Sequence, residues 1–148
     1  MSTYNKIIDA FDAFCEQHKQ INTFYSGQTW NFQTQTNVYP AVIMLPVISS
    51  INNGHIRLTF NLFVADILND DRTNLDDIYS DTLQIVGDIV SYFKDMYGEN
   101  EIDFYLDESN VAIEPFEEEF DDVLAGWMAT IGISYPYSGS ICAIPKTN

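Results

Sequence analysis

The sequence predicts an α+β fold, a mainly antiparallel sheet with two helices packed on one face. Two segments place apolar residues at helical spacing, several others alternate apolar and polar residues, and turn signals rather than long crossovers join the alternating segments. The predicted order is one helix, three strands, a second helix and three strands (α-β-β-β-α-β-β-β). With 148 residues, 46% of them hydrophobic, the chain is expected to form a single domain over residues 1–148.

Two helices are predicted, near the start and in the middle of the chain. The first is capped by Ser2 or Thr3 and runs to about His18, with its apolar side chains on one face. That face comprises Ile7, Ile8, Phe11, Phe14 and Cys15. The second helix spans residues 72–97, with Thr73 as its cap. At the usual rise per residue it is about 40 Å long, enough to cover a whole sheet.

The first extended segments follow the first helix. Residues 24–32 form a short extended piece, and residues 38–48 form an apolar strand that contains Pro40 and Pro46. Proline cannot donate a hydrogen bond to a neighbouring strand. We therefore expect residues 38–48 at the edge of the sheet or with a bulge.

A strong turn signal, Asn52-Asn53-Gly54, precedes the clearest strand of the sequence. Residues 55–64 alternate regularly, which is typical of a strand with one buried face. The buried face is predicted to carry Ile56, Leu58, Phe60, Leu62 and Val64.

The last extended segments follow the second helix. Residues 101–106 and 110–113 are predicted to form a hairpin. The acidic residues 117–122 are predicted as a loop or a helical turn, and residues 123–135 as a long strand.

The charge of the chain is strongly negative and unevenly distributed. Six Lys and Arg against 22 Asp and Glu give a formal net charge of −16, and residues 76–122 hold 16 of the acids with one cation, Lys94. Tight nucleic-acid binding and binding to an anionic membrane are disfavoured, because both need clustered cations. The acidic region is either a solvated surface that aids solubility or a surface that faces a partner or a polyanion.

Catalytic and metal-binding patterns are weak, and we expect neither an enzyme nor a cofactor. Cys15 and Cys142 are interpreted as small hydrophobic residues in a reducing compartment, and His18 and His55 lack a ligand pattern. An EF-hand starting at Asp70 fails, because its sixth residue is not glycine and its twelfth is not glutamate. No signal peptide and no apolar run of membrane-spanning length are found, which favours a cytoplasmic protein.

This chain resembles one protein family in the order of its predicted helices and strands and in the sequence of its last 30 residues. The segment Asp121–Trp127, an alternating strand, Pro136 and the tail Cys142–Pro145 are similar to the ends of tail-terminator, tail-completion and neck proteins of tailed bacteriophages. The segment Phe60–Asp66, which precedes the predicted long helix, also matches this family in its position in the order of elements.

The resemblance implies a structural virion protein without catalytic residues. Such proteins form hexameric or dodecameric rings between head or portal and tail and surround the DNA channel. The expected partners are further copies of the chain and neighbouring portal, neck or tail proteins, and the expected location is the virion, assembled in the cytoplasm of a bacterial host. A strong negative charge suits a conduit that DNA crosses without adhering.

Two other classes remain open from the sequence. An acidic DNA mimic would present carboxylates to a basic nucleic-acid-binding protein and inhibit it. A small hydrolase would use a pair of the 22 carboxylates, although nothing in the sequence selects a pair.

Candidate assembly contacts are placed in turns, in acidic stretches and near the C-terminal tail, because loops and termini commonly carry docking segments. They are Trp30, Pro46, Asn53, Gly54, Arg57, Glu117, Glu118, Glu119, Tyr135 and Tyr137.

Overall fold

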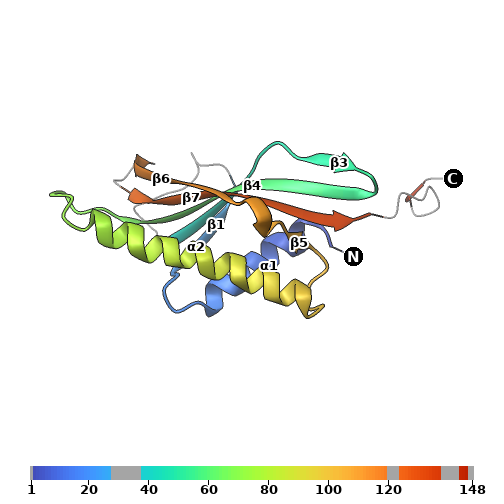
Figure 1. Cartoon of the computed structure of the whole chain (residues 1–148), viewed down its shortest axis with the longest axis horizontal. Helices are drawn as coiled ribbons and strands as arrows, with labels where there is room; N and C mark the ends of the chain where they lie inside the picture. The colour runs from blue at the N-terminus through green and yellow to red at the C-terminus, as the bar shows by residue number, and fades with distance from the viewer. Residues whose placement is uncertain (1, 28–37, 120–123, 138–143, 147–148) are drawn as a thin grey trace.

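The protein is a two-layer α+β structure, with one sheet and both helices on the same face of it (Figure 1). The computed structural model describes residues 2–27, 38–119, 124–137 and 144–146. The predicted fold class is confirmed: the sheet has seven strands and is antiparallel at every pairing except one.

Helix α1 (Tyr4–Gln17) begins at Thr3, whose hydroxyl accepts a hydrogen bond from the Lys6 amide. This confirms one of the two predicted caps. Residue His18 follows the helix and connects it to the second one, because its Nε2 lies 2.9 Å from a carboxylate oxygen of Asp88.

Helix α2 (Leu75–Gly98) begins later than predicted, and Thr73 is not its cap. The Thr73 amide and hydroxyl both donate to the Asp71 carboxylate. Asn74 occupies the cap position, but its side chain makes no capping bond and instead contacts the backbone of the loop that follows the preceding strand. The loop therefore uses these polar side chains to hold its own shape.

The sheet has the strand order β1-β2-β4-β7-β5, with β3 paired to β4 and β6 paired to β7. The strands are β1 (Thr23–Ser26), β2 (Ala41–Pro46), β3 (Ser50–Asn52), β4 (His55–Ile67), β5 (Tyr105–Leu106), β6 (Ala112–Glu119) and β7 (Leu124–Pro136). Among the strands that the structure describes, β1 with β2 is the one parallel pair. The long strands β4 and β7 pair over their full length and form the centre of the sheet.

The prediction that residues 38–48 form an edge or bulged strand is wrong. Strand β2 lies between β1 and β4 and pairs with β4 in continuous register. Pro40 precedes the strand and Pro46 is its last residue, beyond the four residues that pair with β1. Proline at the ends of the strand leaves the inner ladder intact, so an interior position is allowed.

Two predictions for the second half of the sheet are also wrong. Strands β5 and β6 do not form a hairpin with each other; both pair with β7, one after the other along the same edge. The short 3-10 helix η3 (Glu108–Asn110) connects them. Glu117, Glu118 and Glu119 belong to β6 rather than to a loop or helical turn, because pairing with β7 extends to the end of that strand. Residues 120–123 lie outside the described part.

The main core lies between the sheet and the helices. Alternate residues of β2, β4 and β7 face α1 and α2, as the pattern of residues 55–64 predicts. The two helices meet through Phe11 and Phe93, whose rings stack with centroids 4.2 Å apart. The opposite face of the sheet holds a smaller apolar cluster around Ala41, Ile43 and Ala65.

Candidate functional site

An arm, defined here as residues 47–57, projects from the sheet beyond the ends of both helices (Figure 1). It contains the link from β2 to β3, the strand β3, the turn and the first residues of β4. Two isoleucines of the arm are strongly exposed: Ile48 is 92% exposed and Ile51 is 66% exposed. Large apolar side chains exposed to this degree mark interaction surfaces when they occur together.

The backbone of the arm is held by several hydrogen bonds. Asn53 and Gly54 take positive φ angles of 51° and 78°, as a two-residue hairpin turn with twisted strands requires. The Gly54 carbonyl accepts a bond from the Tyr137 amide at 3.0 Å, which attaches the turn to the residue after β7. On the β2 side, the Val47 amide donates to the Thr59 carbonyl at 2.8 Å. The arm therefore presents its isoleucines on a defined structure.

A row of cross-strand pairs runs from the core onto the arm. Ile51 pairs with Ile56, and Ile56 pairs with Tyr135. All three therefore lie on the face of the sheet that carries the helices. Tyr135 is 7% exposed, Ile56 is half-buried and Ile51 is largely exposed. The core face thus continues onto the arm, where no described helix covers it.

Arg57 anchors the base of the arm on the opposite face. Its guanidinium lies against the backbone of Gly132 and 3.5 Å from the Asp107 carboxylate. The pKa of Asp107 is lowered, chiefly by the hydrogen bonds that its carboxylate accepts from the hydroxyl and amide of Ser109 and then by Arg57. The ion pair connects β4 to the residue that precedes η3.

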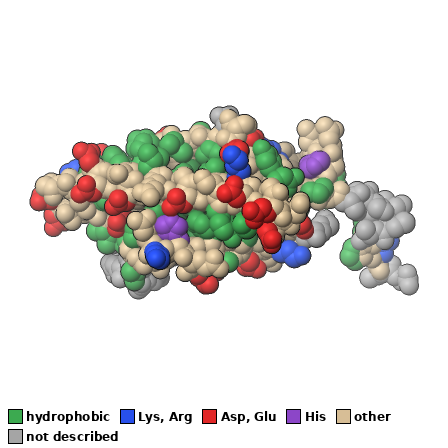
Figure 2. All heavy atoms as spheres, turned by 60° about the horizontal axis from the view of Figure 1, so that its bottom comes forward, with side chains coloured by type: hydrophobic (Ala, Val, Ile, Leu, Met, Phe, Trp, Pro, Cys, Tyr) green, Lys and Arg blue, Asp and Glu red, His purple; other side chains and the backbone are tan. Residues whose placement is uncertain are grey.

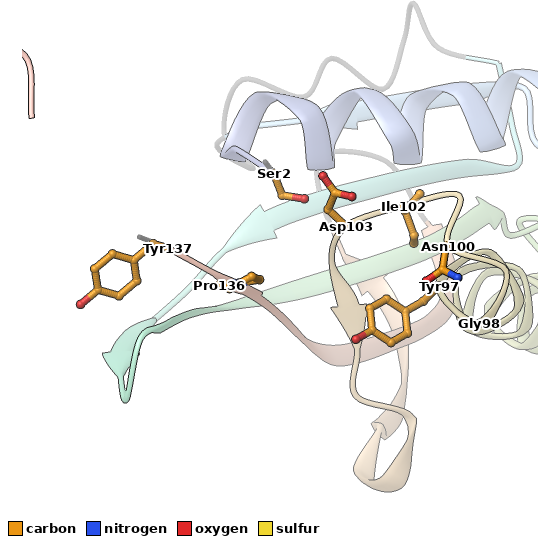
Figure 3. Close-up of a pocket in the computed structure, with 8 residues that line it drawn as sticks. All are labelled: Ser2, Tyr97, Gly98, Asn100, Ile102, Asp103, Pro136 and Tyr137. Carbon is orange, nitrogen blue, oxygen red and sulfur yellow. The ribbon is translucent and has the colours of Figure 1, made fainter. Parts of the chain in front are cut away.

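An open cavity of about 690 Å³ lies at the same end of the molecule (Figure 3). Tyr97 comes from the last turn of α2, Ile102 and Asp103 from the segment after it, Tyr137 from the end of β7, and Ser2 from the start of the chain. Gly98, Asn100 and Pro136 complete the lining, which is therefore a mixture of aromatic, aliphatic and polar residues with one carboxylate. Because Tyr137 also bonds the turn, the cavity adjoins the arm.

The charge differs between the arm and the helix side. Figure 2 shows carboxylates spread along the helix-bearing side, whereas the projecting end carries mainly hydrophobic and neutral side chains. No Asp or Glu occurs between residues 17 and 65. The arm is therefore a part of the surface that a second copy, also charged −16, can approach without facing carboxylates.

The structure places five of the ten predicted assembly contacts at the arm or directly beside it. Asn53, Gly54 and Arg57 are exposed on it, Pro46 is exposed directly before it, and Tyr137 lies beside its turn. These residues therefore lie where a second molecule could contact them.

The remaining predicted contacts do not join this group. Tyr135 is a core residue, not a surface contact, because its side chain lies on the helix-bearing face of the sheet. Glu117 forms an ion pair with Arg72 at the other end of β7, about 35 Å from the arm at the usual rise per strand residue. Glu118 and Glu119 follow it on the same strand. Trp30 lies outside the described residues.

From the sequence, residues 46–54 were expected to form a contact arm, but Ile48 and Ile51 were not singled out within it, and the cavity was missed. A signal for the isoleucines existed: they follow Pro46 and precede Asn52-Asn53-Gly54, so they cannot continue a central strand. The cavity had no such signal, because its lining residues come from three separate parts of the chain.

Neither the models of protein families nor the curated proteins give a match to this sequence. Within the described residues, no three or more His, Cys, Asp or Glu side chains are grouped so that they could hold a metal ion. Neither helix of the described chain is long and apolar enough to cross a membrane.

Proposed function

We propose that the protein is a structural subunit of a homo-oligomeric ring in the neck or tail connector of a tailed bacteriophage, joining head or portal to tail around the DNA channel. The observation that carries the proposal is the projecting arm with its exposed Ile48 and Ile51. The resemblance of the C-terminal sequence to tail-terminator and neck proteins supplies the class of assembly.

The two edges of the sheet support an assembly role for the arm. Edge strands of soluble proteins commonly carry proline or charge, which blocks pairing with another chain. Strand β6 follows this rule with Pro115, Glu114 and Glu117. Strand β3 has the sequence Ser-Ile-Asn, without charge or proline, and pairs on one side with β4. An edge without charge or proline is able to pair with a strand of another chain, and its one apolar side chain, Ile51, is largely exposed.

The charge is consistent with a DNA conduit. A ring of subunits that each carry −16 repels phosphates, so DNA would pass without adhering. The same charge makes subunits repel one another, and salt screens this repulsion. We therefore expect more ring at physiological salt than at low salt.

Native mass spectrometry of the purified protein at both salt concentrations tests the proposal. A closed hexamer or dodecamer is expected, and the double substitution Ile48→Asp with Ile51→Asp is expected to shift it to monomer. Ile67→Asp is the matched control, since Ile67 is also an exposed strand isoleucine, 48% accessible, but lies at the other end of β4. The control should keep the ring.

A chain that stays monomeric at both salt concentrations, with and without the arm substitutions, contradicts the ring. If that monomer binds a basic nucleic-acid-binding protein in a salt-sensitive way, the acidic mimic takes its place. Circular dichroism of each variant shows whether a loss of ring reflects unfolding.

A further inference from the structure

We infer that the arm of one copy docks into the cavity beside Tyr97 and Ile102 of a neighbouring copy. This inference rests on the proposed ring and assigns the two surfaces that form its repeated contact. A contact between two different surfaces of the same chain is the kind that builds rings.

The apolar character of both surfaces supports the contact. The arm offers Ile48 and Ile51, the two most exposed isoleucines of the described chain. The cavity has an open volume of about 690 Å³ and is lined by Tyr97, which is 44% exposed, and by Ile102 and Tyr137. A volume in this range accepts a small group of side chains. Docking would remove apolar surface of both copies from water, which is favourable.

The two surfaces differ in charge. The arm contains no acid and carries His55 and Arg57, the latter shared with Asp107 of its own chain. The cavity is lined by one carboxylate, Asp103, and the adjoining hollow by Asp103, Glu101 and the cation Lys6. The C-terminal end of α2, which carries the negative end of the helix dipole, lies beside the cavity. An acid-free arm is therefore repelled less by this surface than the acidic parts of a second copy would be.

The sheet edge formed by β6 is a poorer acceptor for the arm. Pro115 removes a backbone donor from β6, and Glu114 and Glu117 place carboxylates along it. Pairing of β3 with β6 of another copy would therefore lack part of its hydrogen-bond ladder. Docking into the cavity requires no such ladder, because side chains of the arm would make the contact.

Crosslinking between two variants in the full-length protein tests the contact. Cys142 is first replaced by serine, and Cys15 stays, since its buried thiol is shielded from reagents. One preparation then carries Ile48→Cys, and a second, with a mass tag, carries Tyr97→Cys. After mixing and reassembly, a short bis-maleimide is added and the product is weighed. Ile51→Cys with Tyr137→Cys serves as an independent pair.

We expect a product that joins one tagged and one untagged chain. A contact within the complex raises the effective concentration of the two thiols, so its yield should exceed by about tenfold or more that of the control pair, Ile67→Cys with Tyr97→Cys. A ring whose arm cysteines crosslink only to each other, or a ring in which both test pairs match the control, overturns the inference and leaves the proposed function standing. The crosslink in complexes that contain only two copies supports the contact and overturns the ring.

Discussion

The indole Nε1 of Trp127 donates a hydrogen bond of 2.9 Å to the backbone carbonyl of Tyr79. The bond joins β7, a central strand of the sheet, to the first half of α2. The rings of Trp127 and Tyr79 also lie in tilted contact, with centroids 5.7 Å apart. Trp127 stands in the segment that resembles phage neck proteins. Its place in the structure is a half-buried connection between the two layers.

Replacing Trp127 with phenylalanine removes this donor and keeps an aromatic ring. We expect a loss of about 1 kcal/mol from the hydrogen bond, with a further loss from the smaller ring. Urea denaturation followed by circular dichroism measures it. Tyr79→Phe keeps the accepting carbonyl and should change the free energy of unfolding less; an equal or larger loss would contradict the role given to the indole.

Gly126 and Gly87 predict opposite effects of the same substitution to alanine. Gly126 has a φ of +158°, and a Cβ on it would overlap the Val64 carbonyl of the neighbouring strand. Gly87 lies on the exposed side of α2, where a Cβ meets nothing. We expect Gly126→Ala to cost several kcal/mol or to prevent folding, and Gly87→Ala to stabilise by about 1 kcal/mol. Thermal melting of both variants compares them, and a Gly126→Ala protein as stable as the wild type would show that β4 and β7 can separate locally.

Asp66 and Asp107 predict opposite effects of substitution to asparagine. Partial burial raises the pKa of Asp66, with a smaller contribution from Asp81, whereas hydrogen bonds from Ser109 and the charge of Arg57 lower the pKa of Asp107. A raised carboxyl pKa means that ionisation costs stability at neutral pH, and a lowered one means that ionisation contributes stability there.

We therefore expect Asp66→Asn to raise the free energy of unfolding at pH 7 and Asp107→Asn to reduce it. Both differences should shrink at acid pH: that of Asp66 as the pH falls below its raised pKa, and that of Asp107 as the pH falls through its lowered pKa. Urea denaturation at a series of pH values follows both. The same sign for both variants at pH 7 would refute the assignment.

Cys15 is expected to be inert in the folded protein. Burial raises the pKa of its thiol to about 12, with a smaller contribution from Asp12, so almost no thiolate exists at neutral pH. In a Cys142→Ser background, a thiol reagent should label Cys15 only after denaturation. The Cys15 thiol ionises at a lower pH in the unfolded protein than in the folded one. Burial of the neutral thiol therefore contributes less to stability as the pH rises from about 8.5, the ordinary thiol pKa, towards the pKa of the folded state. Labelling of the folded protein at pH 7 at the rate of a free thiol would contradict this.

The predictable parts of the structure are those with a local cause. The face of β4, the cap at Thr3 and the turn at Asn53 and Gly54 follow from spacing and backbone preference, and all three are confirmed. Strand pairing was harder to infer. Pro46 led to the prediction of an edge strand, because the sequence does not show that β1 pairs only with the part of β2 before the proline. The segments of β5 and β6 were predicted to pair with each other because they are neighbours in the sequence. The sequence does not show that β7 is long enough to pair with both.

The assembly contacts divide in the same way. Exposure of Asn53, Gly54 and Arg57 was predictable from turn and alternation, whereas burial of Tyr135 depends on which face of β7 meets the helices. The cavity depends on the meeting of the start of α1, the end of α2 and the end of β7.

By itself the sequence determined the class of the fold, the face of each long element and the uneven charge, because periodicity, turn residues and composition act over a few neighbouring positions. Only the tertiary structure decided that β2 is an interior strand, that Tyr135 is buried and that Ile48 and Ile51 project into solvent beside a cavity. These features depend on which strands find one another across the chain, and that choice is made by the packing of the whole core.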